Sequence, residues 1–132
     1  MLHSRESGIE LVALDKNSGD IVGELHAYQL RLKVFDHILG NLTIAIDLKF
    51  QGKGIGRSLF SEFFALIKKE YPEIIRVELI VRESNKRAIA LYKSFGFQIE
   101  GKMNCRIRGT TGQLEADIPM TWFFSKILLQ KD

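Results

Sequence analysis

The chain has 132 residues, 45% hydrophobic and 27% charged, and 19 basic against 16 acidic residues give a net charge of +3. This composition excludes disordered and fibrous proteins, and the length predicts a single domain over residues 1–132. The small net charge argues against nucleic-acid partners. No stretch approaches the roughly 18 to 20 apolar residues of a membrane span, so we expect no membrane partner. A single cysteine, Cys105, and the lack of a secretory signal favour a cytoplasmic protein.

The first part of the chain predicts three strands. Ile9–Leu14 and Ile21–Leu30 read as strands, and Asn17-Ser18-Gly19-Asp20 supplies the turn residues of a hairpin between them. Leu42–Ile46 is the third predicted strand. The apolar run from Leu30 to Leu39 is a candidate contact surface, although a buried loop is the favoured interpretation.

Three alternate glycines, Gly52, Gly54 and Gly56, follow the third strand. Because glycine lacks a Cβ, the backbone there can adopt positive φ and let an anion approach its amides. The helix expected next adds unpaired N–H groups and the positive end of its dipole. The loop predicts a phosphate cradle; the alternative is a tight strand-to-helix turn. Arg57 excludes the Walker pattern, and Leu59 replaces the last glycine of the dinucleotide pattern.

Two helices and a strand are predicted next. Apolar residues recur at helical spacing from Arg57 to Tyr71-Pro72, and residues 77–81 alternate as in a strand. Ser84 is the predicted cap of the second helix, and Gly96 stands at its C-terminal end. The apolar stripe of this helix comprises Ala88, Ile89, Leu91, Tyr92 and Phe95.

Two last strands are predicted, Phe97–Glu100 and Ala116–Phe124, around the Gly109–Gly112 turn region. Pro119 cannot donate to a ladder, so it predicts an edge position or a bulge. The element order is strand-strand-strand-helix-strand-helix-strand-strand. This order indicates a mixed α/β sheet with helices packed on it.

The basic residues and the histidines indicate little further chemistry. Lys86–Lys93 and Lys102–Arg108 are the densest basic stretches. A solvated face is the favoured interpretation, and a face for an anionic cofactor is the alternative. His3, His26 and His37 lack metal-ligand spacing with one another or with the cysteine, so no metal is expected.

Together these residues resemble the GNAT superfamily of acetyl-CoA-dependent N-acetyltransferases, in its small bacterial form. The resemblance covers about residues 9–124. Its motifs, in order, are Gln51-x-x-Gly54-x-Gly56, Asn85 and Ala88-x-x-Leu91-Tyr92-x-x-Phe95-Gly96-Phe97. It implies a mixed, mostly antiparallel sheet with a splay between two parallel central strands and helices packed on both faces, here without most of the usual N-terminal strand-helix-helix.

The resemblance also implies that acetyl-CoA is the co-substrate. Its pantetheine arm would bond to exposed strand backbone at Ile44, Ala45 and Ile46. Asn85 would bind the same arm from the start of the second helix; the alternative is a helix-start residue only. The diphosphate would be held by Gln51, Gly52, Lys53, Gly54, Ile55, Gly56, Arg57 and Ser58.

In the implied chemistry a neutral amine, of a small molecule or a protein, attacks the thioester directly. A strand amide near Ile46 stabilises the oxyanion, and Tyr92 protonates the leaving thiolate; the alternative for Tyr92 is a core aromatic. Some family members carry a glutamate five residues before the asparagine, where this chain has Ile80. The candidate bases for the acceptor amine are Glu24, Asp47, Glu78 and Glu100, and none of them is favoured.

The N-terminal segment departs from the family pattern. Family members usually begin with a strand and one or two helices that wall the acceptor pocket, whereas only about eight residues precede Ile9. A second subunit supplies the wall, or the pocket is open, or the chain is a shortened relative without efficient turnover. The first interpretation, a homodimer, is favoured. The predicted function is an amine N-acetyltransferase; the alternative is a non-catalytic acyl-CoA-binding or interaction module on the same fold.

Overall fold

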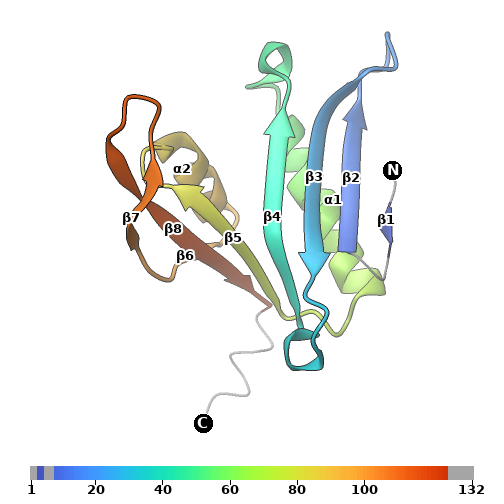
Figure 1. The fold of residues 1–132 in the computed structure, drawn as a ribbon. Coiled ribbons are helices and arrows are strands. Elements are labelled where there is room, and N and C mark those ends of the chain that lie inside the picture. Colours follow the sequence, from blue (N-terminus) through green and yellow to red (C-terminus); the bar gives the residue numbers. More distant parts are fainter. Residues whose placement is uncertain (1–2, 5–7, 125–132) are drawn as a thin grey trace. The chain divides into compact units, whose positions relative to one another are not determined.

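The computed structural model describes residues 3–4 and 8–124, and it divides into two compact units, Met1–Ile74 and Ile75–Asp132. Figure 1 shows the elements of both. The first unit contains β1 (His3–Ser4), β2 (Gly8–Leu14), β3 (Ile21–Gln29), the 3₁₀ turn η1 (Lys33–Phe35), β4 (Ile38–Ile46), the 3₁₀ turn η2 (Leu48–Phe50) and α1 (Ile55–Glu70). The second contains β5 (Arg76–Arg82), α2 (Lys86–Ser94), β6 (Gln98–Ile99), β7 (Met103–Arg108) and β8 (Leu114–Phe123). The single domain over residues 1–132 stays a prediction.

The sheet of the first unit is antiparallel and has the order β1-β2-β3-β4. Leu25 and Ala27 of β3 are buried, whereas the alternate residues Glu24 and His26 are half-buried, because successive side chains of a strand point to opposite faces. The buried face contacts α1: a Cβ placed on Gly23 would lie 3.1 Å from Cγ2 of Ile55. In Figure 1, α1 runs behind these strands. Glu24 and His26 therefore lie on the face opposite α1.

A β-bulge interrupts the pairing of β3 with β4. His26 pairs with Thr43, but Tyr28 pairs with Gly40, so β4 carries one extra residue between these pairs. Asn41 has a φ of 54°, and Leu39 and Leu42 are both buried although they lie three positions apart. β4 begins at Ile38 rather than at Leu42, because the bulge breaks the alternation by which its first half would have been recognised.

Helix α1 confirms the predicted helical stripe. Its buried residues, Leu59, Phe60, Phe63 and Ile67, follow the 3.6-residue period. The helix ends at Glu70, one residue before Tyr71-Pro72, because a residue that precedes proline avoids the helical conformation.

The apolar run before β4 is only partly buried. Ile38 and Leu39 belong to the core, but Leu32 and Val34, in and next to η1, are 65% and 72% exposed. The interpretation of a buried loop is therefore wrong for the first half of this run. Within the described residues, no helix combines the length and the apolar character needed to cross a membrane.

In the second unit β8 pairs with β5 on one side and with β6 and β7 on the other, always antiparallel. The buried residues Val77, Leu79 and Val81 confirm the predicted strand. Strand β7 was not predicted: it has no buried residue, and its pairing is irregular between Met103 and Ile107. The two basic stretches lie mainly on the surface, with Lys86, Arg87 and Lys93 exposed on α2.

Two local predictions for the second unit need correction. Asn85, not Ser84, is the N-cap of α2. Pro119 is not on an edge strand, because Ile80 pairs with it on one side and its carbonyl accepts from Glu100 N–H on the other. The C-terminal glycine of α2 is confirmed, since Gly96 has a φ of 100°.

The parallel, splayed strand pair and the placement of helices on both faces of one sheet involve both units. Which two strands run parallel and splay apart, and which helix covers which face, therefore stay predictions.

Candidate functional site

The glycine loop opens its backbone to solvent. Gly52 and Gly54 have φ values of 78° and 83°, and no described atom lies within 4 Å of the place where a Cβ would stand at either residue. At Gly56, in the first turn of α1, a Cβ would meet Cδ1 of Ile44 at 3.8 Å. The predicted positive φ is thus confirmed at two of the three glycines. An anion has room beside this backbone, so the loop fits the diphosphate that the sequence predicts.

Helix α1 begins at this loop without a side-chain cap. Gly54 is its N-cap and has no side chain, and the first helical hydrogen bond runs from Ser58 N–H to the Gly54 carbonyl at 3.0 Å. The amides of Ile55 and Gly56 precede that bond and point out of the positive end of the helix. The Lys53 ammonium lies 5.2 Å from the centroid of the Phe50 ring and adds positive charge to the loop.

The strand before the loop presents alternate backbone groups. Asp47 N–H donates to the Val22 carbonyl of the neighbouring strand at 2.8 Å. Backbone groups of an antiparallel strand alternate in direction, so those of Ala45 point toward β3 and those of Ile44 and Ile46 point away from it. The Gln51 side chain donates to the Ile46 carbonyl at 3.2 Å and ties the loop to the strand end. The role of Ala45 stays a prediction.

Asn85 lies immediately before α2 and caps it. Its Oδ1 accepts from the Ala88 N–H at 3.1 Å. Its side-chain amide nitrogen makes no hydrogen bond within the described part of the chain. Asn85 is exposed, so one side chain can cap the helix and still offer two N–H donors to a ligand.

Tyr92 is the only residue of α2 that is buried. Its ring centroid lies 5.9 Å from that of Phe97. Burial raises the pKa of the Tyr92 hydroxyl above its ordinary value, because removal from water disfavours the charged form. The hydroxyl therefore keeps its proton at neutral pH, as a general acid must. Tyr92 belongs to the second unit, and the glycine loop to the first.

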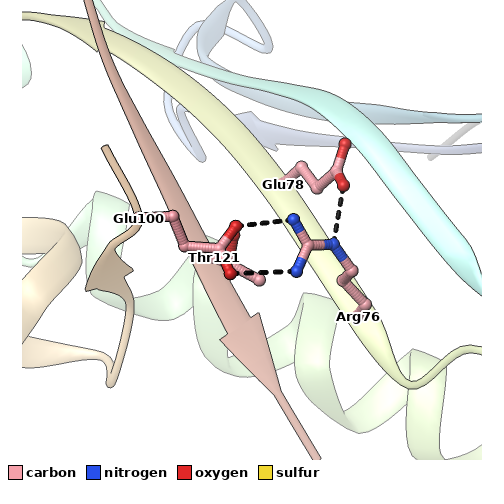
Figure 2. Close-up of polar contacts among 4 residues, drawn as sticks. All are labelled: Arg76, Glu78, Glu100 and Thr121. Atoms are coloured by element: carbon pink, nitrogen blue, oxygen red, sulfur yellow. Dashed lines mark hydrogen bonds and ion pairs between the residues drawn. The ribbon is translucent and has the colours of Figure 1, made fainter. Parts of the chain in front are cut away.

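Arg76 holds two of the four candidate bases (Figure 2). Its guanidinium donates to both oxygens of Glu100, at 2.6 and 3.1 Å, and its Nε donates to Glu78 Oε2 at 2.6 Å. Thr121 donates to Glu100 at 2.5 Å. The hydrogen bonds from Arg76, and then from Thr121, lower the pKa of the Glu100 carboxyl against the opposing effect of burial. Glu100 is therefore a poor proton acceptor at neutral pH.

The other two acids have different partners. Asp47 accepts from the Lys49 N–H at 2.9 Å and caps η2. Glu24 Oε2 lies 2.6 Å from Nδ1 of His26, two residues further along β3. This pair was not predicted, although residues i and i+2 of a strand lie on the same face.

A metal centre has no support among the described residues. No group of three or more His, Cys, Asp or Glu side chains in this part of the chain is arranged to hold an ion.

Comparisons with known proteins agree with this geometry. Residues 6–99 match the family model described as "Acetyltransferase (GNAT) domain". A spermine/spermidine N(1)-acetyltransferase of Bacillus subtilis is 36% identical over 59 residues, which are 45% of this chain and 38% of the relative. The L-amino acid N-acetyltransferase AaaT of Escherichia coli is 30% identical over 83 residues, 63% of this chain and 50% of the relative. The chain thus spans half or less of the length of these two curated relatives.

A solved structure extends the likeness to most of the chain. A GNAT acetyltransferase from Streptococcus pneumoniae superposes with a TM-score of 0.83 and 26% identity, over 92% of this chain and 70% of the other. This likeness confirms the predicted fold class.

Proposed function

The chain belongs to the GNAT family of acetyltransferases, and from this premise we propose that it transfers an acetyl group from acetyl-CoA directly to an amine. The observation that carries the proposal is the uncapped, glycine-lined start of α1, which directs backbone donors at an open space. The cradle comprises Gln51, Gly52, Lys53, Gly54, Ile55, Gly56, Arg57 and Ser58, and it binds the diphosphate of acetyl-CoA.

Strand β4 and Asn85 bind the pantetheine arm in this proposal. The backbone groups of Ile44 and Ile46 that point away from β3 support the first contact, with Ala45 between them. The two amide donors of Asn85 support the second. The N–H of Ile46, which points away from β3, stabilises the oxyanion that forms on the thioester carbonyl.

Tyr92 is the proposed acid for the leaving thiolate. Its hydroxyl holds its proton at neutral pH and can donate it as the carbon–sulfur bond breaks. The acceptor is an amine of a small molecule or of a protein. Polyamines and L-amino acids, named as the substrates of the two curated relatives, are the first acceptors to test.

The test measures CoA release from acetyl-CoA with a panel of polyamines, amino acids, aminoglycosides and peptide N-termini. Acceptor-dependent release supports the proposal. Tyr92→Phe is expected to lower kcat by about 100-fold, the usual contribution of one general acid, and to leave the Kd for CoA unchanged. Tyr71→Phe removes a hydroxyl from another buried tyrosine and is expected to keep wild-type kcat. Tight CoA binding without release across the panel would instead indicate a non-catalytic acyl-CoA-binding module.

A further inference from the structure

The acceptor amine needs a proton acceptor, and three of the four candidate acids have partners that oppose this role. Arg76 binds Glu78 and Glu100 through charged hydrogen bonds at 2.6 Å. Asp47 accepts from a backbone N–H. The hydrogen bonds from Arg76 lower the pKa of the Glu100 carboxyl, and the bonds named here occupy oxygens of the other two carboxylates. Only Glu24 is bonded to an imidazole, that of His26, a ring whose second nitrogen can accept a proton.

The Glu24–His26 contact determines where the imidazole accepts a proton. An ionised carboxylate only accepts hydrogen bonds, so at 2.6 Å the hydrogen lies on Nδ1 of His26. In the neutral ring the lone pair is then on Nε2. That nitrogen makes no hydrogen bond with any described residue. The carboxylate also stabilises the imidazolium that forms when Nε2 takes up a proton, as in a base and its orienting acid.

The pair lies beside the strand segment that we assign to the thioester. Glu24 pairs with Ala45, and His26 pairs with Thr43, across the β3–β4 ladder. Paired residues of adjacent antiparallel strands have Cα atoms roughly 4.5 to 5.5 Å apart. The Glu24 and His26 side chains are 27% and 25% exposed, on the face opposite α1. Both groups are thus accessible from solvent one strand away from the proposed oxyanion donor.

On this face His26 has neighbouring side chains from β2, from β4 and from its own strand β3. Glu10 pairs with it from β2, and Thr43 pairs with it from β4. On β3 itself Glu24 bonds its Nδ1, and the Tyr28 ring lies 5.2 Å from the imidazole. Two carboxylates therefore flank the imidazole, and no described cation pairs with it. Negative surroundings also favour the approach of a cationic amine.

We propose that His26 is the general base of the acetyl transfer and that Glu24 is its positioning residue. This inference rests on the proposed function. The acceptor arrives as an ammonium ion, and Nε2 of His26 removes one proton and leaves a neutral amine. The amine nitrogen bonds to the thioester carbon, and the carbon–sulfur bond breaks. Tyr92 gives its proton to the sulfur and recovers one from the new amide nitrogen, and His26 releases its proton to water.

The pH profile of kcat/KM tests this assignment with the acceptor that the wild type uses best. Wild-type kcat/KM is expected to rise through the range in which histidine titrates and then to level off, because the ammonium form of the acceptor is the one that is used. His26→Gln can use only amine that is already neutral. Its kcat/KM should be about 100-fold lower near pH 7 and should rise tenfold per pH unit toward the pKa of the amine.

Two further variants separate the base from its surroundings. His37→Gln makes the same change at a histidine that lies outside the strands and should keep the wild-type profile. Glu24→Gln should cause a smaller loss, and the double variant should be no slower than His26→Gln alone, because the pair acts as one unit.

The outcomes distinguish the two proposals. A His26→Gln profile of wild-type shape overturns the assignment of His26 and leaves the proposed function standing. A wild type that releases no CoA with any amine of the panel removes the proposed function, and the base assignment with it.

Discussion

The two α-helices of the described residues begin in opposite ways. Helix α1 starts at Gly54, which has no side chain to cap it, after a loop with open space around two glycines. Helix α2 starts at Asn85, whose own oxygen accepts from Ala88 N–H. Its preceding residue is fixed as well, because the Ser84 N–H donates to Glu115 at 3.0 Å.

If the proposed diphosphate site is right, this contrast indicates why it lies at α1 and not at α2. Both helices carry the same partial positive charge at their first turn. At α2 the Asn85 side chain satisfies part of the backbone, whereas at α1 the N-cap glycine has no side chain and leaves those N–H groups open. In the proposed function, the absence of a capping side chain, more than the helix dipole, makes the start of α1 the phosphate site.

The largest expected effect comes from placing a carboxylate at the start of α1. Gly54→Asp puts a negative charge beside the bound diphosphate, and two charges ~5 Å apart at an effective dielectric constant of ~20 repel by about 3 kcal/mol. The Kd for CoA should rise by about 100-fold, measured by titration calorimetry. Aspartate tolerates positive φ better than most residues, so the fold should survive.

Two controls separate charge from backbone strain in this experiment. Gly54→Asn has nearly the same shape without the charge and should weaken binding much less. Gly112→Asp makes the same change at a glycine with a φ of 91° and no described atom within 4 Å of the added Cβ, and it should leave the Kd unchanged. If Gly54→Asp binds CoA as well as the wild type does, α1 does not hold the diphosphate.

The next largest effect concerns the start of α2, where Asn85 caps the helix and is proposed to donate to CoA. Asn85→Ala removes the cap and should lower the free energy of unfolding by about 1 kcal/mol, measured by urea denaturation. Asn85→Asp keeps the cap and should stay near wild-type stability. It lacks the amide donors, so its Kd for CoA should rise about fivefold, as expected for one hydrogen bond of about 1 kcal/mol. Full CoA affinity in Asn85→Asp would reduce Asn85 to a helix cap.

The smallest effect concerns the internal pairing of charges in the second unit. The pKa of Glu100 is lowered in the folded state, chiefly by Arg76. The stabilisation is therefore present above the ordinary glutamate pKa and is lost as pH falls through the folded-state value. The stability difference between wild type and Glu100→Gln should be below about 1 kcal/mol near pH 7 and should vanish in acid. Glu62→Gln, on the exposed side of α1, should show no such pH dependence.

The sequence predicted the elements whose residues follow a regular period. α1 and β5 were recognised because their apolar side chains recur at helical or alternate spacing. β7 was not predicted, because none of its residues is buried and Cys105, at a φ of 58°, interrupts the regular strand backbone. The cap of α2 was misassigned by one position, since serine and asparagine are about equally good caps and only the backbone path decides between them.

The candidate site was predictable in part for the same reason. Glycines 52 and 54 stand where positive φ is needed, and local chain chemistry suffices to predict that. The partners of the acids were not predictable, because Arg76 and Glu100 meet only when β5, β6 and β8 align. The Glu24–His26 pair was predictable in part. The spacing of the two residues within one strand was visible in the sequence, but whether they face solvent depends on which face of the sheet α1 covers.

The bulge at Asn41 gives β4 one position at which a residue can be lost without a change of register. Asn41 and Leu42 together stand opposite a single residue of β3. Loss of Asn41 would therefore leave a regular ladder, in which Ile44 and Ile46 keep their facing. A deletion in the strand beyond the bulge would turn the positions that follow it to the other face, so length variation among natural or engineered relatives should be confined to the bulge and to the segment from Arg31 to His37.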